Sequence, residues 1–111
     1  MDQSDATIKQ REAEKQLALD ALQEVLDLME RESREPDVWE RQCLGYGIAA
    51  VSHGAYALAK VCANKAKIPR SGRSTSEFEP EAALDNCNLR LLKSALESAA
   101  AEPVKSSPAF R

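Results

Sequence analysis

The clearest hydrophobic pattern in the chain runs through its middle, from residue 39 to residue 67. Apolar side chains recur there at alternating intervals of four and three residues, at Leu44, Ile48, Val51, Ala55, Leu58 and Cys62. This spacing places all of these side chains along one face of an α-helix. The pattern therefore predicts a single helix over 39–67, around which the other elements of the chain are organised.

Most of the remaining positions in this predicted helix are small residues. Glycine in a helix interior costs about 1 kcal/mol relative to alanine, so Gly47 and Gly54, seven residues apart, require a packing explanation. Because glycine has no Cβ atom, a neighbouring backbone can approach it closely. The two glycines either seat other helices of the same chain or form a seam with a second copy or a partner.

A first helix is predicted upstream, from about residue 7 to residue 35. Apolar side chains form two adjacent ridges from Leu17 onward, which is typical of a helix that packs on a core. Pro36 cannot continue this helix, and Asp37 with Glu40 matches a capping box that starts the central helix. Because the intervening turn is short, the first two helices are expected to form an antiparallel hairpin.

The connection that follows the central helix, residues 68–79, is long for a helical bundle. Leucines at intervals of three and four residues then predict a third helix over 79–101. Residues 103–111 contain two prolines and are expected to be a disordered tail. The predicted fold is all-α: a three-helix bundle, made of an antiparallel helical hairpin plus a third helix, in a single domain over 1–102.

Length and composition are those of one soluble domain, with 111 residues of which 43% are hydrophobic and 30% charged. No apolar run reaches the roughly 18 residues needed to cross a bilayer, and the first residues do not resemble a signal peptide. Cys43, Cys62 and Cys87 are odd in number and widely spaced, unlike a disulfide framework. We therefore expect a cytoplasmic protein with reduced thiols and no membrane association.

The net charge of −3 is distributed unevenly along the chain. Residues 1–40 hold twelve acidic and five basic side chains, whereas residues 41–76 hold six basic side chains and no acidic ones. In the predicted hairpin these charges would face each other, with Glu12, Glu14 and Asp20 near Lys60, Lys65 and Lys67. The candidate anion-binding patch consists of Lys65, Lys67, Arg70 and Arg73. The helix dipole also favours cations at this helix end, which explains part of the patch without a ligand.

Side chains suited to catalysis or metal binding are few. His53 is the only histidine, and along one helix Cys43 and Cys62 would lie about 14–15 Å from it, too far to share a metal ion. The Gly45-Tyr46-Gly47 segment lacks the preceding strand and the further glycine of a phosphate-binding loop. We therefore expect no enzyme activity, no cofactor and no metal site.

The most direct functional interpretation is a non-enzymatic protein-binding module, such as an adaptor, an inhibitor or a regulatory subunit. The predicted central helix is apolar around most of its circumference, so a homodimer or an obligate partner is expected to cover what the other helices leave exposed. The candidate partner-binding residues are Trp39, Tyr46, Gly47, Gly54 and Tyr56. The alternative is a nucleic-acid-associated regulator that uses the Lys65–Arg73 patch, although the chain lacks a helix-turn-helix pattern and interleaved aromatics.

Overall fold

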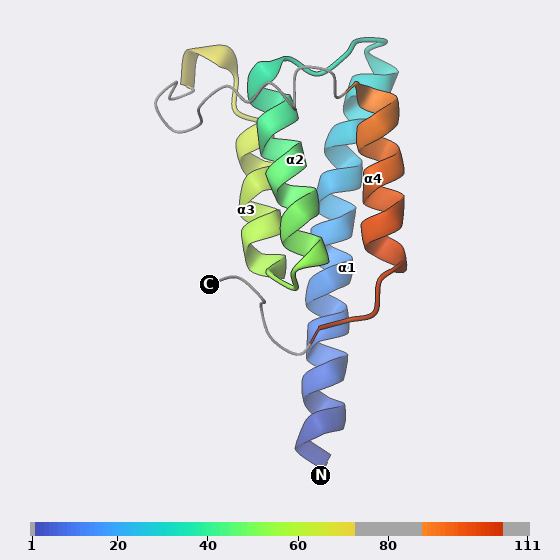
Figure 1. The fold of residues 1–111 in the computed structure, drawn as a ribbon. Helices are drawn as coiled ribbons and strands as arrows, with labels where there is room; N and C mark the ends of the chain where they lie inside the picture. The colour runs from blue at the N-terminus through green and yellow to red at the C-terminus, as the bar shows by residue number, and fades with distance from the viewer. Residues whose placement is uncertain (1, 73–87, 106–111) are drawn as a thin grey trace.

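The computed structural model describes residues 2–72 and 88–105, which form a bundle of α-helices (Figure 1). The helices are α1 (Asp2–Arg31), α2 (Val38–Ser52), α3 (Tyr56–Ala66) and α4 (Leu89–Ala101). A short 3-10 helix, Arg70–Gly72, follows α3. Within the described ranges there is no β-strand, so the prediction of an all-α fold is confirmed for them.

The predicted single helix over 39–67 is wrong, because the chain turns back at His53–Ala55 and forms two helices. Gly54 adopts a left-handed backbone conformation with φ of 82°, which glycine tolerates far better than other residues. The N–H of Gly54 donates to the carbonyl of Val51 at 3.1 Å, and the N–H of Ala55 donates to that of Ala50 at 2.8 Å. This pair of bonds is a Schellman motif, which ends α2.

Because of the break, the described residues form four α-helices where three were expected. α2 packs against α3, α1 and α4, and α1 packs against α3 and α4 as well. Figure 1 shows α3 and α4 on opposite sides of α2, with α1 running the length of the bundle and its N-terminal part extending past the α2–α3 turn. The fold is therefore a helical hairpin, α2–α3, held between a long N-terminal helix and a short C-terminal one.

Close packing of α1, α2 and α3 is centred on Gly47. A Cβ atom on Gly47 would lie 2.8 Å from Cδ2 of Leu22 in α1 and 3.2 Å from Cβ of Cys62 in α3. Both contacts are within one chain, so Gly47 seats neighbouring helices of its own bundle. Large side chains from all four helices fill the core around this point: Leu22, Leu26, Met29, Leu44, Tyr56 and Leu92.

The turn between α1 and α2 contains the predicted capping box. The Asp37 side chain accepts a hydrogen bond from the N–H of Glu40 at 2.8 Å, and the Glu40 carboxylate accepts one from the N–H of Asp37 at 3.0 Å. Arg34 binds the same carboxylate through two guanidinium nitrogens, at 2.7 and 2.9 Å. The hydrogen bond to Glu40, with a second to Glu32, raises the pKa of Arg34.

The C-terminal helix starts later than the predicted 79–101. Asn88 is extended and caps α4 by accepting a hydrogen bond from the N–H of Leu91 at 2.9 Å. Residues 79–87 lie outside the described part, as do 106–111 of the predicted tail. Residues 103–105 are described and are not a free tail, because Val104 packs on the core and the N–H of Lys105 donates to the Tyr56 hydroxyl at 3.1 Å.

Candidate protein-docking surface

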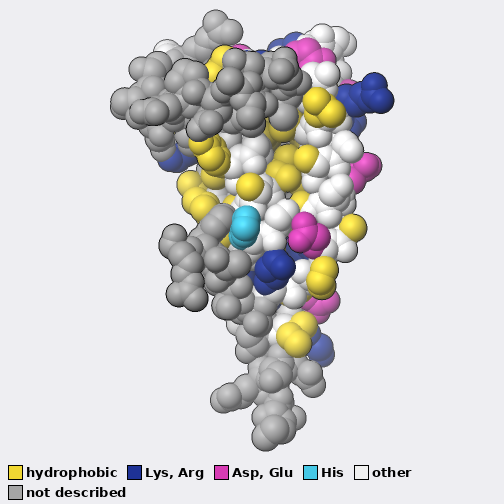
Figure 2. Space-filling view, viewed as in Figure 1, with side chains coloured by type: hydrophobic (Ala, Val, Ile, Leu, Met, Phe, Trp, Pro, Cys, Tyr) yellow, Lys and Arg dark blue, Asp and Glu magenta, His cyan; other side chains and the backbone are white. Residues whose placement is uncertain are grey.

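The outer side of the α2–α3 hairpin carries a group of exposed hydrophobic side chains. Tyr46 on α2 is 42% exposed, and Leu58 and Val61 on α3 are 46% and 47% exposed. We call these three residues, with the surface between them, the α2–α3 face. Figure 2 shows hydrophobic side chains over both helices on this side of the molecule.

The packing register explains why these side chains emerge together. Gly47 points toward α1 and meets Ala59 and Cys62 of α3. Its neighbour Tyr46 is rotated by about 100° on the helix, toward the side of the hairpin that faces away from α1. On α3, Leu58 and Val61 directly precede Ala59 and Cys62. Their side chains therefore project away from the contact between α2 and α3, at about the height of Tyr46 along the pair.

The α2–α3 face lies in a part of the chain that has no carboxylate. Every Asp and Glu residue lies outside positions 41–72, whereas Lys60 and Lys65 are both on α3. Lys65 is seven residues after Leu58 and four after Val61, so it continues the exposed stripe along the helix. Burial raises the pKa of the Cys62 thiol beneath this stripe, and the charge of Lys65 acts in the opposite direction. The α2–α3 face is therefore apolar, and Lys65 lies beyond it on the same side of α3.

Four of the five predicted partner-binding residues lie in the interior. Trp39 is 9% exposed and its indole N–H donates to the carbonyl of Lys65 at 2.7 Å, which ties the start of α2 to the end of α3. Tyr56 is 1% exposed. Gly47 lies in the packing seam and Gly54 in the turn, both buried. The structure thus places only Tyr46 of this set on the surface.

Leu58 and Val61 were absent from the predicted set. Under the single-helix prediction, Leu58 belonged to the same buried stripe as Leu44 and Ile48. The turn at Gly54 changes the direction of the chain, so the side of α3 that carries Leu58 faces solvent. The sequence signal that could have identified it is the pair His53-Gly54, because glycine just after a helical segment is a common C-terminal signal.

The structure describes only some of the side chains in the predicted anion-binding patch, which consists of Lys65, Lys67, Arg70 and Arg73. Lys67 forms an ion pair with Glu24 of α1, and this hydrogen bond and charge lower the pKa of the Glu24 carboxyl. The backbone of Arg70 is in the 3-10 helix, but its side chain and all of Arg73 lie outside the described part. A four-cation patch therefore stays a prediction, with Lys67 already bound to a carboxylate of the same chain.

Charge matching between helices occurs, but not between the predicted residues. Because α3 runs back along α2, its C-terminal end meets the second half of α1, where Lys67 pairs with Glu24. On the other side of α1, Lys93 of α4 pairs with Glu30 at 2.6 Å, and this bond raises the pKa of Lys93. Glu14 pairs within its own helix, with Arg11 at 2.6 Å.

A polar cluster joins α1 to the α2–α3 turn and to the chain after α4. Arg11 donates to the carbonyl of Lys105 at 3.0 Å and to that of Gly54, and its guanidinium lies 4.5 Å from the centre of the Tyr56 ring. Lys15 is 8% exposed and donates to the carbonyls of Ala100, at 3.1 Å, and Glu102. These bonds satisfy carbonyl groups at the end of α4, which assigns the cluster a structural role.

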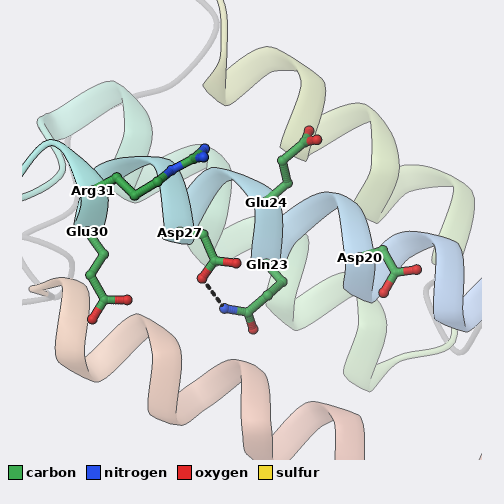
Figure 3. Close-up of a pocket in the computed structure, with 6 residues that line it drawn as sticks. All are labelled: Asp20, Gln23, Glu24, Asp27, Glu30 and Arg31. Carbon is green, nitrogen blue, oxygen red and sulfur yellow. Dashed lines mark hydrogen bonds between the residues drawn. The ribbon is translucent and has the colours of Figure 1, made fainter.

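An open groove of about 670 Å³ follows the outer surface of α1 (Figure 3). Its lining residues are Asp20, Gln23, Glu24, Asp27, Glu30 and Arg31. Glu24 points toward α3 and Glu30 toward α4, in agreement with their ion pairs, and the amide of Gln23 donates to Asp27 at 2.9 Å. The groove has no nucleophile beside a base, which is the arrangement that acyl or phosphoryl transfer would need.

The described residues contain no group of three or more His, Cys, Asp or Glu side chains that could hold a metal ion. None of the helices in the same ranges is long and apolar enough to cross a membrane. Cys43 and Cys62 are buried and unbridged.

Comparison of the chain with protein-family models, with curated proteins and with solved structures gives no match in any of the three.

Proposed function

We propose that the protein is a non-enzymatic, cytoplasmic protein-binding module that docks another protein on the α2–α3 face. The observation that carries this proposal is the grouping of Tyr46, Leu58 and Val61, each more than two-fifths exposed. Single exposed hydrophobic residues are common on protein surfaces. Several of them on one side of a helix pair are less common, and large exposed apolar patches mark interaction sites.

The chemistry of the face suits a protein partner. Burial of apolar surface contributes about 25 cal/mol per Å², and tyrosine is enriched at the centre of interfaces, where its ring is buried and its hydroxyl can bond. Leu58 and Val61 add aliphatic surface on the neighbouring helix. A small-molecule site would need a concave pocket, whereas these side chains are exposed on the outer side of two helices.

The hairpin is a rigid platform for such binding. Contacts at Gly47, in the middle of the pair, and the bond from Trp39 to Lys65, at the start of α2 and the end of α3, fix the register of the two helices. Binding to side chains on a preformed helix pair orders little additional backbone, so less conformational entropy opposes association.

The nucleic-acid alternative has weaker support. Lys67, one of its four cations, is bonded to Glu24, and α1 presents an acidic groove that would repel a phosphate backbone. An adaptor, an inhibitor or a regulatory subunit is the kind of protein that needs an apolar docking face and no reactive groups.

Site-specific photocrosslinking tests the proposal. Benzoyl-phenylalanine is placed at position 58 of the full chain, expressed in the organism that carries the gene, and at position 91 as the control. Leu91 is similarly exposed, at 50% against 46% for Leu58, but lies on α4. The expected result is a discrete protein adduct from position 58 that is absent from position 91 and lost in the Val61→Glu background. Equal adducts from both positions, or none, would contradict the proposal.

A further inference from the structure

We infer that residues 106–111 of the same chain cover the α2–α3 face when no partner is bound, so that a partner has to displace them. These six residues directly follow Lys105, the last residue of the described part. The regulation rests on the proposed docking function, because a cover matters only if the face binds a partner.

The segment after α4 is held on a path that leads to the hairpin. Figure 1 shows residues 103–105 crossing α1 from the end of α4. Arg11 of α1 donates to the carbonyl of Lys105 at 3.0 Å and also to the carbonyl of Gly54, in the α2–α3 turn. The N–H of Lys105 donates to the hydroxyl of Tyr56, the first residue of α3, at 3.1 Å. Residues 106–111 therefore follow from a point beside the turn that joins α2 to α3.

The distance from this point to the α2–α3 face is within reach. Phe110 is five residues after Lys105, and an extended chain of that length spans up to about 17 Å. Leu58 and Val61 lie about 3 and 7.5 Å farther along α3 than Tyr56, at a rise of about 1.5 Å per residue. Because Tyr56 is at the start of α3, the segment has to pass only the end of that helix to reach its outer side.

The sequence of the segment suits the surface that it reaches. Residues 106–111 contain the apolar run Pro-Ala-Phe and no acidic residue. Tyr46, Leu58 and Val61 offer an aromatic ring and two aliphatic side chains, all largely exposed. Contact of Phe110 with them removes apolar surface on both sides from water, and a pair of aromatic rings adds a favourable interaction.

The covalent connection makes a small contact sufficient. A tether of a few residues gives the segment an effective concentration of about 1 mM at its own face. The face of a second molecule, at micromolar concentration, competes poorly with that. A contact this small is also displaced by a partner that buries more surface, and the covered fraction lowers the apparent affinity for that partner.

Another exposed hydrophobic residue lies near the same exit point. Ile8 is three residues before Arg11 on α1 and is 45% exposed. It offers one side chain, whereas the α2–α3 face offers three, so the face gains more from burial.

Methyl NMR of the full chain tests the inference. Phe110→Ala removes the aromatic ring, and the magnetic field of that ring shifts the signals of the methyl groups beside it. We expect the methyl signals of Leu58 and Val61 to move in this variant, while those of Leu91 on α4 stay in place. Ser106→Ala, in the same segment, is the matched control and is expected to move none of these signals.

Three results would overturn the inference. The first is that the Leu58 and Val61 signals do not move in Phe110→Ala, and the second is that the Ile8 signals move more than they do. The third appears on dilution of the chain. A difference between variant and original chain that persists comes from one molecule, as expected, whereas a difference that disappears comes from a second copy.

Photocrosslinking from position 58 separates the inference from the proposed function. We expect Phe110→Ala to raise the yield of the protein adduct about two- to fivefold, as the covered fraction is released. An unchanged yield would show that the segment does not compete with the partner, which overturns the regulation. If the adduct forms but the methyl signals do not move, only the inference fails. If the signals move but neither chain forms an adduct, the segment covers the face and the docking function fails.

Discussion

Gly47 and Leu22 approach so closely that the glycine has no room for a side chain: a Cβ atom at position 47 would lie 2.8 Å from Cδ2 of Leu22. Leu22 is fully buried, so it can move only by disturbing the core. Gly47→Leu is therefore expected to lower the free energy of unfolding by about 1–3 kcal/mol or more. Urea denaturation measures the change, with Ala49→Leu at an exposed position of α2 as the control. Equal stabilities of the two variants would show that the close approach is not real.

Gly54 is required for its backbone conformation rather than for space. At φ of 82°, a side chain is strained by about 1–2 kcal/mol. We expect Gly54→Ala to lower the melting temperature and Gly54→Asn, which tolerates the left-handed region better, to lower it less. A Gly54→Ala variant as stable as the original chain would indicate that α2 and α3 can join into one helix.

The ion pair between Glu24 and Lys67 gives stability a dependence on acid pH. The pKa of Glu24 is lowered from the ordinary value of 4.5 by the hydrogen bond and charge of Lys67. A carboxyl with a lowered pKa in the folded state stabilises the fold above its ordinary pKa, and this contribution is lost as pH falls through the lowered value. Glu24→Gln should therefore flatten the decline of unfolding free energy below pH 4.5, as measured by urea denaturation at several pH values. Glu12→Gln, which removes one carboxylate from the same helix, is the control, and a decline flattened equally in both variants would contradict the role of the Glu24–Lys67 pair.

Lys15 is the cation most deeply placed in the described structure, at 8% exposure. Lys15→Met removes the donor to the carbonyls of Ala100 and Glu102, and we expect a loss of about 1–3 kcal/mol because these carbonyls lose a charged partner. Thermal unfolding followed by circular dichroism gives the difference, and Lys9→Met, at an exposed position of α1, is the control. A loss as large in Lys9→Met would mean that charge alone, and not this contact, is responsible.

Sedimentation of the purified chain addresses the homodimer expected from its hydrophobic pattern. If the α2–α3 face docks another protein and not a second copy of the chain, the isolated chain should sediment at micromolar concentration as a monomer near 12.2 kDa. A concentration-dependent dimer that Val61→Glu dissociates would instead support self-association through this face.

Local sequence rules identified the features of the fold that depend on a few neighbouring residues. The capping box at Asp37 and Glu40 and the end of α1 before Pro36 follow from side chains within one turn of each other. The break at Gly54 was missed because the four-and-three spacing continues across it without interruption. Ala55 and Cys62 are buried as the pattern requires, so periodicity alone contains no sign of the turn.

The candidate site was less predictable, because exposure depends on which helices cover a residue. Tyr46 was expected on a binding surface and is exposed, while Trp39, also chosen for its aromatic ring, is buried. Both lie on the same side of α2, but only Trp39 is opposite the end of α3, where the carbonyl of Lys65 accepts its N–H. That difference depends on where α3 ends. The sequence of α2 alone contains no information about that position.

The bond from Trp39 to Lys65 also has a consequence for the order of folding. It joins residues 26 positions apart, whereas the bond from Arg11 to Lys105 joins residues 94 positions apart. Closing a longer loop costs more chain entropy, so local pairings tend to form first. The chain has one tryptophan, and in stopped-flow refolding its fluorescence should reach the native value before a probe attached at position 105 reports docking of the C-terminal segment.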